Sequence, residues 1–263
     1  MIEKNKIPKK IHYCWFGKNP LPELAVKCIE SWNKYCPDYE IIKWDESNFD
    51  INCCPYVKEA YEAKKWAFVS DVARLYALVN YGGIYMDTDV EVLKPLDDLL
   101  ELEAFSGFES ETGIQTGIMA CEKGQALFKE LLDDYNEEHF LKEDGTLDCT
   151  TNVIRITNTC LKYGLELNNK KQTVNGFTLF PKEFFCPKDV GTFKLNITKN
   201  SYTIHHFNGS WLSEEQQYYV KLTKKYNRFL PNAIAWRLAR FYSIKKYQGR
   251  RAAYRKIFKW KNK

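Results

Sequence analysis

The chain has 263 residues, of which 44% are hydrophobic and 28% are charged, a composition typical of a globular protein with a full core. It contains no run of 18 apolar residues, so we expect no membrane-spanning helix. The nine cysteines are odd in number and include no Cys-x-x-Cys pair, and the amino terminus lacks the apolar segment of a signal peptide. These features predict reduced thiols and a cytoplasmic location.

Charge is distributed unevenly along the chain. Residues 221–263 contain 15 Lys plus Arg and no Asp or Glu, whereas the residues before them contain 24 basic and 34 acidic ones. We therefore expect an acidic domain at residues 1–220 and a basic amphipathic helical tail at residues 221–263.

Aromatic and basic residues interleave in this tail. Such a helix suits an anionic membrane surface, where each Lys or Arg contributes on the order of 1 kcal/mol. We expect peripheral contact with the inner face of the cell membrane, and packing of the tail on the domain is the alternative. No nucleic-acid-binding motif is present, so we expect no nucleic-acid partner.

The first elements predict a parallel βαβ unit. Ile7–Phe16 is predicted as a strand, Glu23–Tyr35 as a helix and Tyr39–Trp44 as a second strand, because apolar residues recur at the matching periods. A single long helix is then expected at Val57–Asn80. Gly82-Gly83 ends that helix and turns the chain into a central strand. Later strands are expected at 105–108, 117–120, 178–180 and 201–206, and later helices at 125–135 and 153–163.

The stretch Tyr81–Val92 (YGGIYMDTDVEV) places two carboxylates one residue apart after a short apolar run. If it is a strand, Asp87 and Asp89 point to the same face. A hard divalent cation such as Mg²⁺ or Mn²⁺ removes the repulsion between them and also binds phosphate oxygens. Because ligands collect at the carboxyl ends of strands in open α/β sheets, we interpret the motif as a metal–phosphate site rather than a solvated turn.

Two further pairs of residues are candidates for the same site. Asp71 and Arg74 share a helix face, which is consistent either with a surface ion pair or with a helix that aims both at a ligand above Asp87. His205 and His206 face opposite sides if Ser201–Phe207 is a strand, so only one can join the aspartates.

Three blocks of this sequence carry a resemblance to a known family: IPKKIHYCWFG, KWAFVSDVARLYALVNYGGIYMDTDVEVLKPLDDLL and YTIHHFNGSW. Over roughly residues 7–212 the chain resembles the DXD-containing sugar transferases of glycosyltransferase family 32, and more distantly the catalytic domains of large clostridial glucosylating toxins. The resemblance implies an α/β fold of the GT-A (Rossmann-like) type, a nucleoside-diphosphate sugar donor, Mn²⁺ or Mg²⁺, and retention at the anomeric carbon.

The same resemblance implies roles for individual residues. Asp87 would contact ribose and metal, and Asp89 would bind the metal directly. His206 would be the third protein ligand, because His206-Phe207-Asn208-Gly209 is similar to an HFxG element of related transferases; His205 is the alternative. The implied catalytic residues are Asp71, Arg74, Asp87 and Asp89, and the implied substrate-binding residues are Trp15, Ser70, Asp71, Arg74, Tyr85, Asp87, Ser210 and Trp211.

The expected function is therefore transfer of a hexose or N-acetylhexosamine from a UDP-linked donor to a glycan or lipid-linked glycan in bacterial capsule or other surface polysaccharide synthesis. A transferase that modifies proteins is an alternative. A D-x-D phosphatase is disfavoured because Glu91 stands where that motif has Thr or Val, and because the motif follows some 85 residues instead of opening the fold. A noncatalytic sugar-binding module is the third alternative.

Overall fold

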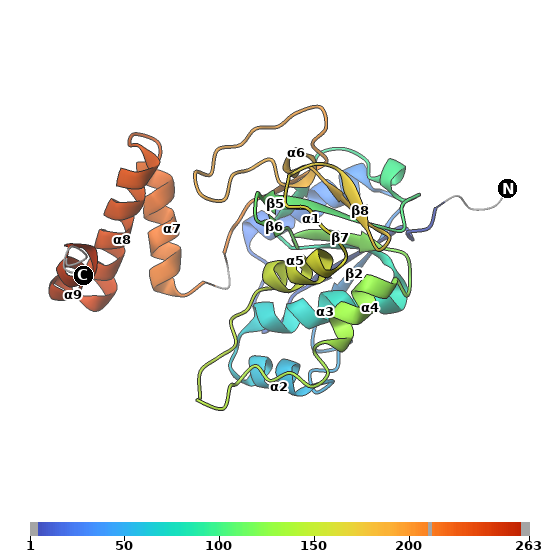
Figure 1. Cartoon of the computed structure of the whole chain (residues 1–263), viewed down its shortest axis with the longest axis horizontal. Helices are drawn as coiled ribbons and strands as arrows, with labels where there is room; N and C mark the ends of the chain where they lie inside the picture. Colours follow the sequence, from blue (N-terminus) through green and yellow to red (C-terminus); the bar gives the residue numbers. More distant parts are fainter. Residues whose placement is uncertain (1–4, 210–211, 259–263) are drawn as a thin grey trace. The chain divides into compact units, whose positions relative to one another are not determined.

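A computed structural model describes residues 5–209 and 212–258 of the chain (Figure 1). Its internal contacts divide into two compact units. The α/β unit takes the described residues of Met1–Lys188 and Asn196–His206, and the helical unit takes those of Asp189–Leu195 and Phe207–Lys263. The expected boundary at residue 220 falls inside helix α7 (Glu214–Tyr226), which runs unbroken through it.

The α/β unit begins with the expected parallel βαβ arrangement. β1 (Lys10–Cys14) pairs in parallel with β2 (Glu40–Trp44), and α1 (Glu23–Tyr35) connects them. Helix α1 starts after Pro22 and buries Ala25, Cys28 and Trp32, which recur at helical spacing. The prediction of this helix is confirmed at both ends.

The single helix expected at Val57–Asn80 is wrong, because the chain forms two helices there. α2 (Pro55–Glu62) and α3 (Trp66–Tyr81) are separated by a short break. Lys64 has a φ of 56°, which cannot continue a right-handed helix, and the Lys65 N–H donates to the Ala60 carbonyl as in a Schellman motif. Sequence periodicity missed this break because a lysine, instead of the usual glycine, adopts the left-handed conformation.

The central sheet is mixed, with strand order β2-β1-β3-β7-β5-β9-β8 and a short β6 beside β5. The pairs β1–β2, β1–β3 and β5–β9 are parallel, whereas β7 is antiparallel to both of its neighbours. A separate two-stranded sheet pairs β4 with β10. The remaining elements of this unit are β3 (Gly83–Met86), β4 (Val90–Val92), η1 (Asp97–Leu99), β5 (Ala104–Ser110), β6 (Gly113–Ile114), β7 (Ile118–Cys121), α4 (Ala126–Asp133), α5 (Asn152–Lys162), β8 (Gln172–Val174), β9 (Phe177–Phe180), α6 (Lys182–Phe185) and β10 (Thr203–His205).

Helices cover both faces of the sheet. Alternate residues of β3 enter different cores: Tyr85 joins the cluster under α2, α3 and α4, whereas Ile84 and Met86 join the cluster under α1. Figure 1 shows α3 and α4 together on one side of the sheet. This three-layer arrangement confirms the expected α/β fold class.

The order of the strands indicates which edge of the sheet can bind a ligand. β1 lies between β2 and β3, so the chain moves to one side of β1 and then to the other. Such a reversal leaves a crevice at the carboxyl ends of the two inner strands. β5 runs in the same direction as β3, because both are antiparallel to β7, and its carboxyl end therefore meets the same edge. Asp87 directly follows β3 at this edge.

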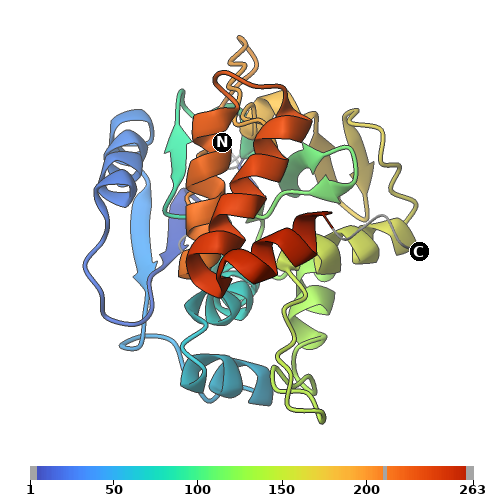
Figure 2. The same cartoon turned by 90° about the vertical axis from the view of Figure 1, so that its left-hand side faces the viewer.

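The helical unit consists of α7, α8 (Asn232–Gln248) and α9 (Arg250–Phe258), together with the segment 189–195. Figures 1 and 2 show α7 and α8 side by side, joined by a turn at one end. Asn227 and Trp236 both donate side-chain hydrogen bonds to the Gly191 carbonyl, which ties the segment 189–195 to these helices. Within residues 5–209 and 212–258, no helix combines the length and apolarity that crossing a bilayer requires.

Candidate functional site

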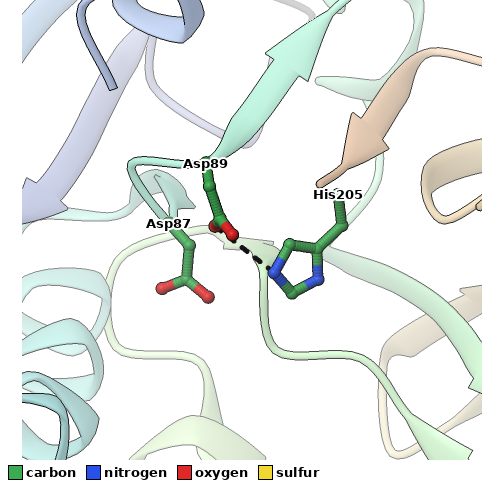
Figure 3. Close-up of side chains that lie close together, drawn as sticks. All are labelled: Asp87, Asp89 and His205. Atoms are coloured by element: carbon green, nitrogen blue, oxygen red, sulfur yellow. Dashed lines mark ion pairs between the residues drawn. The ribbon is translucent and has the colours of Figure 1, made fainter. Parts of the chain in front are cut away.

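Asp87 and Asp89 lie in the turn that follows β3, so strand alternation does not decide where their side chains point. The Val90 N–H donates to the Asp87 carbonyl, which closes the turn between β3 and β4, and the Asp87 N–H donates to the Gly117 carbonyl of the segment before β7. Their carboxylates nevertheless converge with the imidazole of His205 (Figure 3). One ligand atom from each of the three residues lies within 4.8 Å of the other two.

The register between β10 and β4 selects which histidine enters this group. His205 pairs with Val90, next to the turn, and its Nε2 lies 3.3 Å from Asp89 Oδ1. His206 turns the other way, as strand alternation predicts, and its Nε2 lies 2.8 Å from Glu91 Oε2. The geometry therefore favours His205, the alternative, over His206, which the sequence resemblance preferred.

Gly117 makes room for the imidazole. A Cβ added at Gly117 would lie 2.9 Å from His205 Nδ1, closer than side-chain carbons normally come to other atoms. The segment before β7 thus approaches the ring only because residue 117 has no side chain.

The three converging side chains fit a divalent cation. Two carboxylates and one imidazole offer the oxygen and nitrogen donors that Mn²⁺ accepts, and all three groups are only partly buried. Burial of the His205 ring by itself lowers its pKa, but the adjacent Asp89 carboxylate raises the pKa well above the ordinary histidine value. The proton on the His205 ring thus balances the charge of Asp89, and a metal ion bound by the neutral ring would take over that role.

A buried arginine flanks the opposite side of Asp87. The Nη2 atom of Arg74 lies 3.0 Å from Asp71 Oδ1 and 3.3 Å from Asp87 Oδ1, and the Arg74 side chain is only 6% exposed. Nη1 donates to the Thr116 carbonyl, and the guanidinium lies over the ring of Tyr85, whose hydroxyl donates to Asp87 Oδ1. Asp71 and Arg74 therefore do not form a surface ion pair. Helix α3 directs Arg74 toward the turn that contains Asp87, which was the other arrangement consistent with the spacing of the two residues.

The same surroundings change the pKa of Asp71. Burial raises the pKa of Asp71 to about 6, the charge of Arg74 opposes this rise and the charge of Asp87 adds to it. The backbone carbonyl of Asp71 also accepts a hydrogen bond from the Asn152 amide at the start of α5. Asp71 and Arg74 are both buried, so the face of α3 toward Asp87 lies inside the protein.

Trp15 and Ser70 were also expected to bind the donor, and the side chain of each donates a hydrogen bond to a backbone carbonyl nearby in the sequence. Trp15 follows β1 at the same sheet edge, and its indole N–H donates to the Asn19 carbonyl. Ser70 precedes Asp71 on α3, and its hydroxyl donates to the Trp66 carbonyl. Ser210 and Trp211 lie outside the described residues.

Sequence reasoning missed two charged residues at this site. Glu109 lies near the end of β5, and Lys182 begins α6 after Pro181, which follows β9. Burial raises the pKa of Glu109, the charges of His205 and Lys182 oppose the rise, and the charge of Asp87 adds to it. The positions of Glu109 and Lys182 in the sequence could have indicated them, because each lies near the end of a strand or follows one. β5 and β9 are parallel and end at the same sheet edge as β3.

Fold and site together define a class: an α/β protein that gathers an Asp-x-Asp turn, a histidine and a buried arginine at the edge where such folds bind phosphorylated ligands. Residues 22–106 match the family described as "Glycosyltransferase sugar-binding region containing DXD motif". The resemblance of this chain to DXD-containing glycosyltransferases is thereby confirmed over residues 22–106.

Individual proteins show where this similarity extends. The chain is 37% identical over 122 residues to "Inositol phosphoceramide mannosyltransferase 3" of Schizosaccharomyces pombe, covering 45% of this chain and 34% of that protein. It is 25% identical over 175 residues to "Subversion of eukaryotic traffic protein A" of Legionella pneumophila, covering 54% of this chain and 27% of that protein. The chain thus spans about a third or less of the length of these curated relatives. Among solved structures, "PaToxG Glycosyltransferase" aligns with a TM-score of 0.44 and 18% identity, over 59% of this chain and 69% of that one.

Proposed function

We propose that this chain is a metal-dependent glycosyltransferase that moves a sugar from a nucleoside-diphosphate donor to a glycan or lipid-linked glycan, with retention at the anomeric carbon. The observation that carries the proposal is the convergence of Asp87, Asp89 and His205 within 4.8 Å. The two aspartates lie inside residues 22–106, the stretch that matches the sugar-binding family. Turnover of a nucleotide-sugar donor would separate this function from that of a noncatalytic sugar-binding module.

In this proposal Asp87, Asp89 and His205 hold the cation. When bound, Mn²⁺ or Mg²⁺ would neutralise the charge that develops on the departing diphosphate. Nη2 of Arg74 contacts the carboxyl groups of both Asp87 and Asp71, so the arginine fixes their orientation. Asp71 and Arg74 would then present hydrogen-bonding groups to the donor sugar, with Trp15 against the nucleoside.

The chemistry needs no nucleophile from the protein. The bond between the anomeric carbon and the diphosphate oxygen breaks, the acceptor oxygen bonds to the same face of that carbon, and the acceptor proton passes to a phosphate oxygen. Fixed charges that stabilise a developing anion supply a large part of the rate in such sites. The buried Arg74 and the preformed Asp87–Asp89 turn are charges of this fixed kind.

The donor and acceptor are matters for experiment. The sequence resemblance led us to expect a UDP-linked sugar, whereas the printed name of one relative, an inositol phosphoceramide mannosyltransferase, directs attention to mannose and to a lipid acceptor. A role in bacterial surface polysaccharide synthesis and a location in the cytoplasm remain parts of the proposal. The free state of all nine cysteines supports a reducing location.

The test is a panel of UDP- and GDP-linked sugars incubated with Mn²⁺, the full chain and either a glycan or a lipid acceptor. We expect one donor to be consumed with release of nucleoside diphosphate, loss of turnover in EDTA, and a product with the anomeric configuration of the donor. A protein acceptor glycosylated in place of the glycan would select the protein-modifying alternative. Donor binding without turnover on any acceptor, or phosphatase activity that depends on Asp87, would contradict the proposal.

A further inference from the structure

The helical unit contains a cavity of about 350 Å³ along one face of α7. Its lining residues recur every three or four positions, so they share one side of the helix, and one residue of the segment before α7 completes the wall. They are Asn208, Gln217, Val220, Lys221, Lys224, Lys225 and Arg228. Neither the α/β unit nor its candidate site contributes to this cavity.

The chemistry of the lining specifies an anion with several oxygen atoms. Four of the seven lining residues are cationic, two carry side-chain amides, and none of those described is acidic. An arginine fork can bind two oxygens of one phosphate, whereas lysines act as point charges around it. The volume lies at the lower end of the range for small-ligand sites, which suits a phosphate ester with a small headgroup.

Exposed apolar side chains lie next to this cavity in the chain. Phe229 directly follows Arg228, and its 81% exposure is unusual for so large an apolar residue. Ile234, in the first turn of α8, is 50% exposed. Phe229 thus belongs to the turn that joins α7 to α8, the end of this helix pair seen in Figures 1 and 2. Cations beside protruding aromatic and aliphatic groups are the arrangement that binds lipid headgroups and inserts into the acyl boundary.

We propose that this cavity is a binding site for the phosphate of an anionic membrane lipid, with Phe229 inserting into the bilayer beside it. Single-stranded nucleic acid fits the observations less well, because such ligands need an extended basic groove that follows many phosphates. Here four cations line a single cavity. The site gives the basic tail a defined point of attachment, and it does not depend on the proposed sugar transfer.

The experiment measures co-sedimentation of the full chain with vesicles of phosphatidylcholine containing phosphatidylglycerol, and with vesicles of phosphatidylcholine alone. The cavity variant is Lys221→Gln, Lys225→Gln and Arg228→Gln; the matched control is Arg240→Gln, Arg251→Gln and Arg255→Gln. All six side chains are exposed, and both variants lose three charges. We expect the cavity variant to lose affinity for anionic vesicles on the order of 100-fold, and the control variant less than about tenfold.

A second arm separates a lipid source from free phosphate. Inorganic pyrophosphate should compete for the cavity of the unmodified protein and release it from anionic vesicles. Phe229→Ser should weaken vesicle binding several-fold while pyrophosphate binding stays unchanged. Leu161→Ser, which removes an exposed apolar side chain from the α/β unit, should change neither.

Three outcomes would overturn the proposal. The first is an equal loss in the cavity and control variants, which would mean diffuse electrostatic adsorption. The second is equal binding to neutral and anionic vesicles. The third is cavity-dependent binding of a short oligonucleotide with no binding to vesicles, which would assign the cavity to nucleic acid. The pyrophosphate competition uses the unmodified protein; with sodium chloride of equal ionic strength as its control, it separates binding in the cavity from diffuse adsorption even if a variant is unstable.

Discussion

The two aspartates of one three-residue turn have different electrostatic surroundings. Asp87 lies beside Arg74, a permanently charged and buried guanidinium, and accepts a hydrogen bond from Tyr85. Asp89 lies beside His205, whose charge depends on pH. A cation entering the site can therefore displace a proton from His205, but it cannot displace the charge of Arg74. The Asp87 side thus acts as a fixed support and the Asp89 side as the exchangeable part.

The largest effect is expected on the fixed side. Arg74→Met leaves the carboxylates of Asp71 and Asp87 without their buried cation, so the free energy of unfolding should fall by about 3–5 kcal/mol. Urea unfolding measures this change. Lys162→Met, which removes one partner of an exposed pair with Glu130, is the control and should cost less than about 1 kcal/mol. Comparable losses in the two variants would mean that the Arg74 network is not the support described.

A large effect on activity is expected at Asp89. Asp89→Asn removes a ligand charge without changing shape, and turnover of the active donor should fall at least about 100-fold. The thermal midpoint should fall less than in Arg74→Met, because backbone atoms close the turn and His205, unlike Arg74, can lose its charge when Asp89 is neutralised. Asp133→Asn, at an exposed position of α4, should retain full activity. Full turnover of Asp89→Asn in the presence of EDTA would end the metal-dependent mechanism.

A smaller effect is expected on Mn²⁺ affinity, where replacing His205 and replacing His206 should give different results. His205→Gln should weaken Mn²⁺ binding about 10- to 100-fold, because it removes a ligand atom from the group of three. His206→Gln should weaken it less than about threefold, because that ring contacts Glu91. Titration calorimetry with Mn²⁺ measures both values. The reverse order would restore His206 as the metal ligand.

The smallest effects expected are two dependences on pH: as the pH rises, the stability of the metal-free fold should fall and the affinity for Mn²⁺ should rise. In the metal-free protein, the raised pKa of His205 means that its pairing with Asp89 stabilises the fold fully below the ordinary histidine value of 6.5, and that this stabilisation is lost as the pH rises through the raised pKa. Mn²⁺ requires the neutral ring, so its affinity should rise over the same window by up to about tenfold per pH unit. Calorimetry in buffers of different ionisation enthalpy should detect release of about one proton per Mn²⁺. In His205→Gln both dependences should disappear.

Local sequence patterns predicted much of the fold and half of the site. The βαβ start, helix α1 and the placement of Asp87 after an apolar strand all follow from periodicity and strand-end rules. The shared face of Asp71 and Arg74 was also visible, but the burial that makes them part of the site was not.

What the sequence did not reveal depends on contacts between distant segments. The choice of His205 over His206 follows from the register of β10 against β4, which involves residues more than 100 positions apart. The break between α2 and α3 depends on a lysine in a left-handed conformation. The end of β5, where Glu109 lies, meets the same sheet edge as β3 only because β7 reverses direction between them.

The bare backbone at Gly117 links two positions that are far apart in the sequence. Any larger residue there would push against the His205 ring, because even a methyl carbon would come within 2.9 Å of Nδ1. Among homologous chains we therefore expect glycine at this position to covary with histidine at the end of β10. Where the histidine is replaced by a smaller side chain, alanine or serine at the glycine position becomes sterically acceptable.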